Sequence, residues 1–326
     1  MNENIISCPK SLENITDTIK IFCAGPIQGA PDWQHSLPEI NGVTWICPRR
    51  ESYEGFDYDQ QTSWETLGLR ISDAVMFWIP APEKEIPGRG YAQTTRIEFG
   101  ECLGRGKKIF IGIYPDYNGR KYFQNKLSEY EAQELHEDLD SLLREIKNWV
   151  DIRRNSKDSI FFTSDTHFSS QRALELSKRP FRNTQDMDWT IIERWNKIVP
   201  LGSTVFHLGD FGELWPLHYL NGNIKFILGN YEESGKTEIP PVDVLGKLWH
   251  QKMSGLDIWM SHRPLSVKKF DGMSLFGHIH GRQKVKPWGG LDVGVDCNNF
   301  SPISLDDVKF FWNAIEKGYY DEDVWS

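Results

Sequence analysis

The sequence predicts a chain of two α/β domains, and three observations carry that prediction. In the first half, short apolar runs alternate with segments of polar, helix-like periodicity, which is typical of a parallel sheet covered by helices. The polar and charged segment 151–159 then reads as a linker. The alternation begins again after this segment, and 326 residues are enough for two domains. We therefore expect one domain at 17–150 and a second at 158–326.

Four buried strands are expected in the first domain, because four runs are rich in apolar, β-branched and aromatic residues. They are 19–25, 43–47, 74–80 and 108–114. A closing helix is expected from Glu129 to Trp149, where leucine and isoleucine recur at helical spacing. The turn AGPIQGA, residues 24–30, follows the first strand, and its glycines suit a close approach of the backbone to a ribose or a phosphate.

Six short apolar runs are expected to form strands in the second domain: 159–165, 204–210, 225–230, 257–262, 273–278 and 291–296. Residues of metal-binding type stand at or after most of their ends, where layered α/β folds place ligands. Taken singly, each has an ordinary role as a turn former, a helix cap or a buried histidine. Together they predict a site for a borderline metal such as Mn, Fe, Zn or Ni. The candidate ligands are Asp165, His167, Asp210, Asn230, His262, His278 and His280.

This ordered set resembles the calcineurin-like metallophosphoesterase family, whose pattern is D-x-H, G-D, G-N-H, H and G-H-x-H. The resemblance covers about 160 to 310 and extends to flanking segments similar to bacterial and phage phosphohydrolases. It implies a layered α/β domain, a β-sandwich with flanking helices, that holds two divalent metal ions, with Mn favoured. One ion would take Asp165, His167, Asp210 and His280, and the other Asn230, His262 and His278, with the Asp210 carboxylate bridging both. Such an ion pair clamps a phosphate and ionises the attacking water.

Tyr231 departs from that family pattern, which has a histidine after the asparagine. In the family this histidine contacts the phosphate and helps the leaving oxygen depart. A phenol is a weaker acid than an imidazolium. We therefore expect the rate of hydrolysis to be reduced more for alkyl phosphomonoesters than for phosphodiesters, cyclic phosphates or activated phosphates. His207 and His218 are candidates to replace the missing acid, and Arg263 is a candidate substrate-binding residue. A metal-bearing scaffold without catalysis is the alternative.

Glu98 is the candidate nucleophile of the first domain, and its local sequence allows two interpretations. In one, Thr95-x-x-Glu98 is a capping box in a helix that begins near Thr94 or Thr95. In the other, the carboxylate lies near the positive end of that helix, stays ionised and attacks a sugar carbon.

The region from about 19 to 115 resembles the nucleoside 2-deoxyribosyltransferase family, especially shorter relatives marked by AGPI, W, PRR and E-x-G. The resemblance implies a flavodoxin-like or Rossmann-like parallel sheet. It also implies that Glu98 attacks C1′ of a (deoxy)nucleoside or nucleotide, and that the sugar then passes to another base or to water, as in a retaining glycosidase. Asp73 matches an acidic residue that positions the sugar or the base. Further candidates for substrate binding are Gly25, Pro26, Trp33, Gln34 and Tyr91.

Two residues depart from this second family. Ala92 stands six residues before Glu98, where better-known transferases carry an aspartate that helps protonate the base. Phe22 stands where the first strand often carries a tyrosine. Both departures fit a hydrolytic glycosidase or a different substrate as well as they fit base exchange.

Composition limits the partners and the location. A net charge of −9 argues against binding to duplex DNA. The N-terminus lacks the basic start and apolar core of a signal peptide, and no apolar run approaches the length of a membrane span. Five cysteines without a C-x-x-C pair suit free thiols in a reducing compartment. We therefore expect a cytoplasmic protein without a membrane partner, and the second resemblance implies a homo-oligomer.

The two domains together predict a bifunctional nucleotide-processing enzyme. One domain would cleave or exchange an N-glycosidic bond, and the other would hydrolyse a phosphate ester. The alternatives are a first domain that acts on a dinucleotide such as NAD, and a ligand-binding or assembly module in either half.

Overall fold

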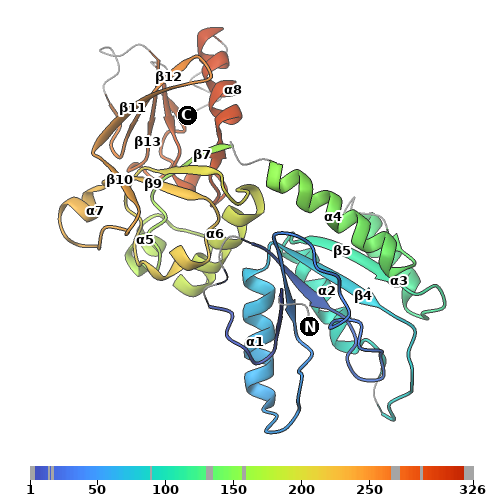
Figure 1. Ribbon diagram of the computed structural model, residues 1–326. Coiled ribbons are helices and arrows are strands. Elements are labelled where there is room, and N and C mark those ends of the chain that lie inside the picture. The colour runs from blue at the N-terminus through green and yellow to red at the C-terminus, as the bar shows by residue number, and fades with distance from the viewer. Residues whose placement is uncertain are drawn as a thin grey trace. The chain divides into compact units, whose positions relative to one another are not determined.

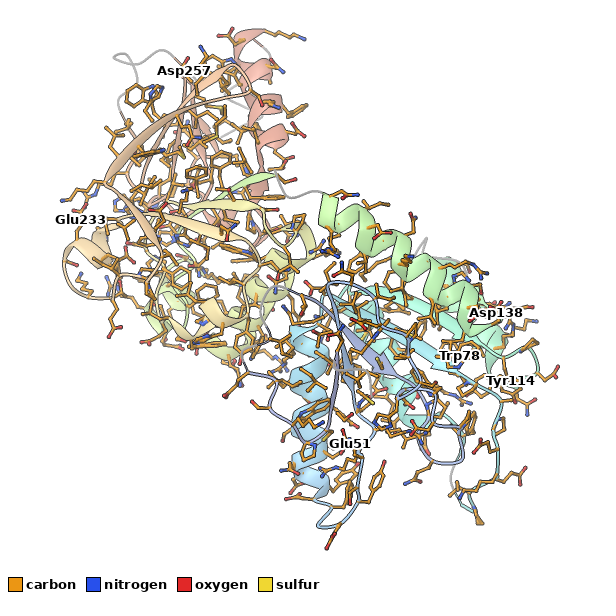
Figure 2. All side chains as sticks on the ribbon, in the orientation of Figure 1. Glu51, Trp78, Tyr114, Asp138, Glu233 and Asp257 are labelled. Atoms are coloured by element: carbon orange, nitrogen blue, oxygen red, sulfur yellow. The ribbon has the colours of Figure 1, made fainter. Side chains whose placement is uncertain are left out.

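The computed structural model of the protein describes residues 4–13, 15, 18–88, 90–129, 135–155, 159–265, 272–286 and 289–318. The chain folds into two compact units, Met1–Asn155 and Ser156–Ser326 (Figure 1). Side chains fill the space between strands and helices within each unit (Figure 2). Among the described residues, no helix combines the length and the apolar character needed to cross a membrane.

The first unit contains a six-stranded sheet in the order β1-β3-β2-β4-β5-β6. Every neighbouring pair is parallel. All residues of the three strands β3, β2 and β4 are buried, as expected for a parallel sheet covered on both faces. The prediction of an α/β fold with a parallel sheet is confirmed. The strands are β1 Ile5–Ser7, β2 Ile19–Ala24, β3 Val43–Cys47, β4 Ala74–Ile79, β5 Lys108–Ile113 and β6 Leu135–His136.

Helices α1, α2 and α3 pack on one face of this sheet. On that face, the ring of Phe22 in β2 lies so close to Gly68 of α1 that an added Cβ would be 2.8 Å from it. The rings of Phe77 in β4 and Phe99 in α2 meet edge to face at 5.5 Å, and Phe99 in turn lies 4.7 Å from Phe123 of α3. The helices are α1 Tyr58–Ile71, α2 Gln93–Gly104 and α3 Arg120–Glu129.

Helix α4, Leu139–Asn155, covers the opposite face, where the ring of its Trp149 lies 5.5 Å from Phe110 of β5. This helix corrects the predicted range of 129–149, because Leu135 belongs to strand β6. Its buried stripe consists of Leu142, Ile146 and Val150, and the helix continues beyond this stripe into the expected linker as far as Asn155. The start of the predicted helix, 130–134, and residues 156–158 of the linker lie outside the described residues.

The second unit contains two five-stranded sheets, and each of the six predicted runs overlaps a strand. The first sheet has the order β10-β9-β8-β7-β16, with four parallel strands and an antiparallel β16. Its strands are β7 Ile160–Thr163, β8 Thr204–His207, β9 Asn223–Ile227, β10 Asp243–Gly246 and β16 Ile303–Ser304.

The second sheet has the order β11-β12-β13-β15-β14, in which β12, β13 and β15 are parallel and the two edge strands are antiparallel. Its strands are β11 Leu248–Met253, β12 Leu256–Ser261, β13 Met273–Phe276, β14 Val285–Lys286 and β15 Gly290–Asp292.

Neighbouring residues of β7 show how these sheets form layers. Phe162 joins a core cluster with Met260 and Leu275 of the second sheet. Phe161, which points the other way along the strand, joins a cluster with Trp195 of helix α6. The first sheet is therefore covered by the second sheet on one face and by α6 on the other. The helices of this unit are α5 Gln171–Leu176, α6 Thr184–Ile198, α7 Asn230–Glu233 and α8 Leu305–Glu316, with short 3₁₀ turns at Trp215–His218 and Val295–Cys297.

Candidate active sites

A cavity of about 750 Å³ lies at the carboxyl edge of the sheet in the first unit. Residues that follow β2, β3, β4 and β5 line it, and so do one face of α1 and the beginning of α2. The carboxyl edge of a parallel sheet is the usual place for a ligand, because the loops there are free to vary while the strands hold them in place.

Gly25 and Pro26, two of the predicted substrate-binding residues, line this cavity directly after β2. An added Cβ on Gly25 would lie 2.3 Å from the carbonyl oxygen of Trp78 and 2.7 Å from Cζ2 of Trp33. The chain therefore needs a glycine at this point of close packing.

Trp33 and Gln34 correct the prediction that they border the base, because neither is among the residues that line the cavity. Trp33 is buried behind Gly25. Gln34 is fully buried, and its side-chain oxygen accepts a hydrogen bond of 3.0 Å from Nε of Arg49. Both side chains belong to the interior of the unit.

Glu98 lines the cavity from helix α2, and the capping-box interpretation is wrong. The helix begins at Gln93, and its cap residue Ala92 has a left-handed φ of 56° and no side-chain cap bond. Thr95 and Glu98 are therefore the third and sixth residues of the helix. A capping box requires the threonine at the cap and the glutamate at the third position of the helix, and neither residue is at its required position.

The environment of Glu98 also corrects the expectation that the helix end keeps it ionised. Burial raises the pKa of Glu98 to about 8, and the negative charges of Glu65 and Glu101 act in the same direction. The positive field of a helix start fades within the first turn, whereas Glu98 is the sixth residue. Desolvation of the carboxylate therefore outweighs the field of the helix.

The raised pKa of Glu98 predicts a pH-dependent stability. An acid whose pKa rises from 4.5 to about 8 on folding binds its proton more tightly in the folded state. Stability is then lost as the pH rises from the lower value through the higher one. Glu98→Gln removes this titration, so the melting temperature of the variant should increase relative to that of the wild type as the pH rises from 5 to 8. Thermal unfolding followed by circular dichroism tests this, and a constant difference across the range would contradict it.

Tyr91, another predicted substrate-binding residue, also lines the cavity, and its hydroxyl donates a hydrogen bond of 2.9 Å to the carbonyl of Pro80. Phe22, in contrast, is fully buried between the sheet and α1, so it does not take part in this site.

Asp73 corrects the sequence prediction that it positions the sugar or the base. It precedes β4 and so lies at the amino edge of the sheet, about 20 Å from the carboxyl edge by the length of a six-residue strand. Its buried carboxylate accepts a hydrogen bond of 2.8 Å from the backbone N–H of Lys20 and lies 4.0 Å from Arg153. Its role is in the fold, where it joins β2 to α4.

In the second unit, an oxygen of Asp210 lies between two histidines. Oδ2 of Asp210 is 3.5 Å from Nε2 of His167 and 3.5 Å from Nε2 of His262. Because these histidines belong to the two different predicted ligand sets, this oxygen has the position of a bridging ligand.

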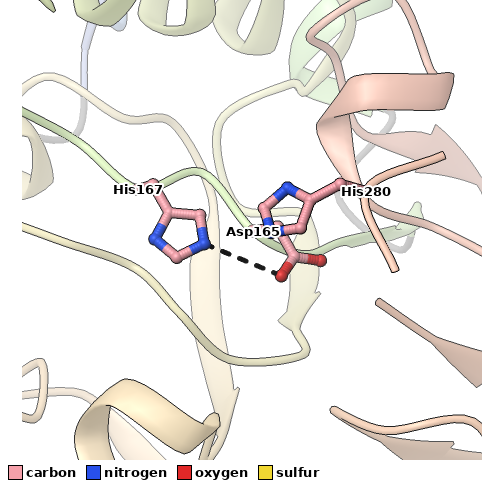
Figure 3. Close-up of side chains that lie close together, drawn as sticks. All are labelled: Asp165, His167 and His280. Carbon is pink, nitrogen blue, oxygen red and sulfur yellow. Dashed lines mark ion pairs between the residues drawn. The ribbon is translucent and has the colours of Figure 1, made fainter. Parts of the chain in front are cut away.

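The remaining predicted ligands lie around this carboxylate. Nε2 of His262 is 3.0 Å from Oδ1 of Asn230 and 3.2 Å from Nδ1 of His278. The rings of His167 and His280 stack at 5.2 Å, and Figure 3 shows both close to Asp165. The structure thus brings all seven predicted ligands together.

The chemistry of this cluster fits a metal site. Two overlapping groups, Asp165 with His167 and His280, and Asp165 with Asp210 and His262, each place their ligand atoms within 4.8 Å of one another. Oδ1 of Asp165 and Nε2 of His167 are buried and have no hydrogen-bond partner. An unpaired buried polar atom costs about 1–3 kcal/mol, a cost that a coordinated ion would remove.

Backbone strain gathers on the same residues. Left-handed φ values are uncommon for residues other than glycine, and such outliers persist where the surrounding structure enforces them. Five of the seven predicted ligands have one: Asp165 at 57°, His167 at 48°, Asp210 at 56°, His278 at 69° and His280 at 50°.

Two carboxylates that were not among the predicted site residues hold this cluster in place. Asp296 accepts a hydrogen bond from Nδ1 of His280 at 2.8 Å and also binds the guanidinium of Arg179. Glu232 accepts from the backbone N–H groups of Asp210 and Gly229 at 3.0 and 2.9 Å, which ties two ligand-bearing loops together. Asp296 ends a predicted run, LDVGVD, so the signal used for the other ligands was present there as well.

Tyr231 lies beside the cluster, with its ring centroid 5.0 Å from that of His167, and its backbone N–H donates to Oδ1 of Asp210 at 2.9 Å. The ammonium of Lys236 lies 5.1 Å from the centre of the tyrosine ring. Arg263 is exposed, and its charge acts on neighbouring His278.

His207 and His218 are poor replacements for an acid beside these ligands. His207 is fully buried among aromatic rings, where burial lowers its pKa to about 3. His218 is exposed and lines a different, apolar hollow with Leu214 and Leu217.

Comparison with known proteins identifies the class of the first unit. Residues 18–117 match the family described as "Nucleoside 2-deoxyribosyltransferase like", so the first unit contains a domain of that family. The chain is also 31% identical over 177 residues to the "Uncharacterized protein MJ1445" of Methanocaldococcus jannaschii. This match covers 49% of this chain and 92% of that protein. The chain belongs to the same family as that protein.

A solved structure is similar as well. The crystal structure of AQ665 from Aquifex aeolicus, described as a protein of unknown function, has a TM-score of 0.39 and 20% sequence identity. It covers 47% of this chain and 98% of that chain.

Proposed function

We propose that the first unit cleaves or exchanges the N-glycosidic bond of a (deoxy)nucleoside or nucleotide, with Glu98 as the nucleophile. The observation that carries this proposal is the side chain of Glu98 in a cavity of about 750 Å³, within the residues 18–117 that match the family. A cavity of this volume suits a ligand of nucleoside size.

The proposed step begins with attack of the Glu98 carboxylate on C1′ of the sugar. A C1′–O bond forms while the C1′–N bond breaks, and the base departs with the electron pair. Water or a second base then displaces the carboxylate. Three exposed aromatic residues at the cavity, Tyr53, Phe56 and Tyr58, offer faces on which a base can stack.

A direct test is to incubate the full chain with purine and pyrimidine nucleosides and their 5′-monophosphates and to follow base release by mass spectrometry. Addition of a second free base distinguishes exchange from hydrolysis. Release of no base from any of them would contradict the proposal.

We propose that the second unit is a metal-dependent phosphoesterase, which makes the chain a bifunctional nucleotide-processing enzyme. Two divalent ions, with Mn favoured, would be held by Asp165, His167, Asp210, Asn230, His262, His278 and His280. The unpaired buried atoms Oδ1 of Asp165 and Nε2 of His167 support this assignment most directly. When bound, such ions polarise a phosphate and lower the pKa of water.

Tyr231→His is expected to raise kcat/KM on 5′-monophosphates by up to about 10²–10⁴-fold, the range that a general acid contributes. The ring at this position lies 5.0 Å from His167, so an imidazole there has access to the same site. p-Nitrophenyl phosphates and 2′,3′-cyclic phosphates need little protonation of the leaving oxygen, so their rates should change far less. The measurement is kcat/KM for both variants with added Mn²⁺ over leaving groups of graded pKa.

Tyr219→His is the matched control, because Tyr219 packs on Trp189 and Trp215, neither of which is a predicted ligand. Equal rate changes across the whole substrate series would mean that Tyr231 binds substrate instead of standing at the position of an acid.

A further inference from the structure

The cavity of the first unit contains a second carboxyl group that the proposed step at Glu98 does not use. Tyr58, Gln61, Thr62 and Glu65 line the cavity, and their spacing of three and four residues places them on one face of α1. Glu98 lines the same cavity from α2. We propose that Glu65 is the general acid that protonates the departing base in the reaction at Glu98.

This inference rests on the proposed glycosidic function, and it arises from a requirement of that reaction. A nucleobase that leaves C1′ carries away the bonding electron pair and is a poor leaving group as an anion. A proton delivered to a ring nitrogen in the transition state contributes typically 10²–10⁴-fold. The donor must stand in the cavity, on a group that is not already committed elsewhere.

Other protic groups of the cavity suit this role less well. The hydroxyl of Tyr91 donates to the carbonyl of Pro80 at 2.9 Å. The hydroxyl of Tyr117 accepts from Arg96 at 2.6 Å and donates to the carbonyl of Tyr91 at 3.3 Å. Glu85 is exposed to water.

Glu65 is held in place by a buried hydrogen-bond chain. Nε2 of Gln61 donates to Oε1 of Glu65 at 2.8 Å, and Oε1 of Gln61 accepts from Nε of Arg50 at 2.7 Å. Both Gln61 and Arg50 are buried. The bond from Gln61 occupies Oε1 of Glu65, which leaves Oε2 to carry the proton.

The electrostatics of the two carboxyl groups show where the proton of this pair lies before substrate binds. Burial raises the pKa of Glu65, and the charge of Glu65 in turn helps to raise the pKa of Glu98. The rise is larger at Glu98, so Glu98 holds the proton of the pair in the free protein, whereas the hydrogen bond from Gln61 and the charge of Arg50 lower the pKa of Glu65 against the effect of burial. The proposed step therefore needs this proton to pass from Glu98 to Glu65 when the nucleoside binds, which leaves Glu98 ionised as the nucleophile and Glu65 protonated as the acid.

The proton and electron balance is closed within the cavity. As the C1′–N bond breaks, its electron pair goes to the base nitrogen, which takes the proton from Oε2 of Glu65, and the Glu98 carboxylate forms a bond to C1′. Glu65 is now a carboxylate. It removes a proton from the water or the incoming base that displaces Glu98, which restores both groups.

The test compares two leaving groups with the full chain. Inosine and 2′-deoxyinosine need protonation of the departing base, whereas N7-methylguanosine and its 2′-deoxy form already release a neutral base. Glu65→Gln should lower kcat/KM on the first pair by about 10²–10⁴-fold and on the second pair by less than about 3-fold. Asp59→Asn is the matched control, because it removes a carboxylate from the same helix that does not line the cavity.

The outcomes separate this inference from the function on which it rests. A wild type that releases no base from the four nucleosides or from their 5′-monophosphates, or a Glu98→Gln variant that keeps full activity, overturns the glycosidic function and the role of Glu65 with it. If Glu98→Gln is inactive while Glu65→Gln lowers kcat/KM equally on both pairs of nucleosides, or on neither pair, only the role of Glu65 fails. Circular dichroism at the assay temperature shows whether each variant is folded.

Discussion

Glu98→Gln is expected to abolish base release from every nucleoside that the wild type cleaves. An amide oxygen is not a nucleophile at neutral pH, so the glycosyl-enzyme cannot form. Removal of the nucleophile of a covalent mechanism lowers the rate by at least about 10⁴-fold. Helix α2 should persist, because its cap at Ala92 makes no use of the Glu98 side chain. The measurement is kcat/KM by mass spectrometry, beside a circular dichroism spectrum of each variant.

Glu101→Gln is the control for this experiment. Glu101 lies on the same helix, one turn after Glu98, and forms an exposed ion pair of 2.8 Å with Arg105. Its loss removes one of the charges that raise the pKa of Glu98, so a small shift of the pH profile is expected with activity retained. Undiminished base release by Glu98→Gln would exclude Glu98 as the nucleophile and leave its carboxyl as a group that shapes the cavity.

The ten inner strands of the three sheets could be predicted from the sequence because most of their residues are buried. A run such as 74–80 consists of apolar residues with bounds that are easy to see, and β4 occupies Ala74–Ile79 within it. The six strands at the edges of the three sheets were not predicted, because each is short or largely exposed: β1, β6, β10, β11, β14 and β16. The pattern therefore gave no sign of them.

The candidate metal cluster could be predicted because each of its side chains stands at or just after the carboxyl end of a strand, and parallel strands bring these ends together. The same argument fails for Asp73. This residue precedes its strand, and only knowledge of the strand direction relative to the cavity places it at the opposite edge.

The cavity of the first unit was harder to predict, since its lining depends on how helices face one another. In the sequence, Glu65 is a charged residue in a helical segment, and nothing local distinguishes it from Asp59 on the same helix. Only the packing of α1 and α2 on one face of the sheet brings it to the cavity of Glu98. Trp33 and Gln34 show the converse, because polar or aromatic residues near a glycine turn can also be buried.

Asp210→Asn is expected to remove most bound metal and all phosphoesterase activity. Oδ2 of Asp210 lies 3.5 Å from a histidine of each predicted ligand set, so a single carboxylate would serve both ions. Asparagine keeps an oxygen for the backbone N–H of Tyr231, which Asp210 now accepts at 2.9 Å, but it loses the charge and the second ligand oxygen. The loop should therefore fold while metal affinity falls.

The measurement for Asp210→Asn is the metal content after dialysis against Mn²⁺ and then against metal-free buffer, beside the rate on a p-nitrophenyl phosphodiester. Asp243→Asn is the matched control, since Asp243 is an exposed carboxylate of the same sheet that pairs with Lys225 at 2.6 Å. Base release by the first unit should be unchanged in both variants, because Glu98 and its cavity belong to the other compact unit. Two retained equivalents of metal with full phosphoesterase activity would show that Asp210 bridges no ions, and the role of the shared ligand would then pass to Asp165, which belongs to both candidate groups.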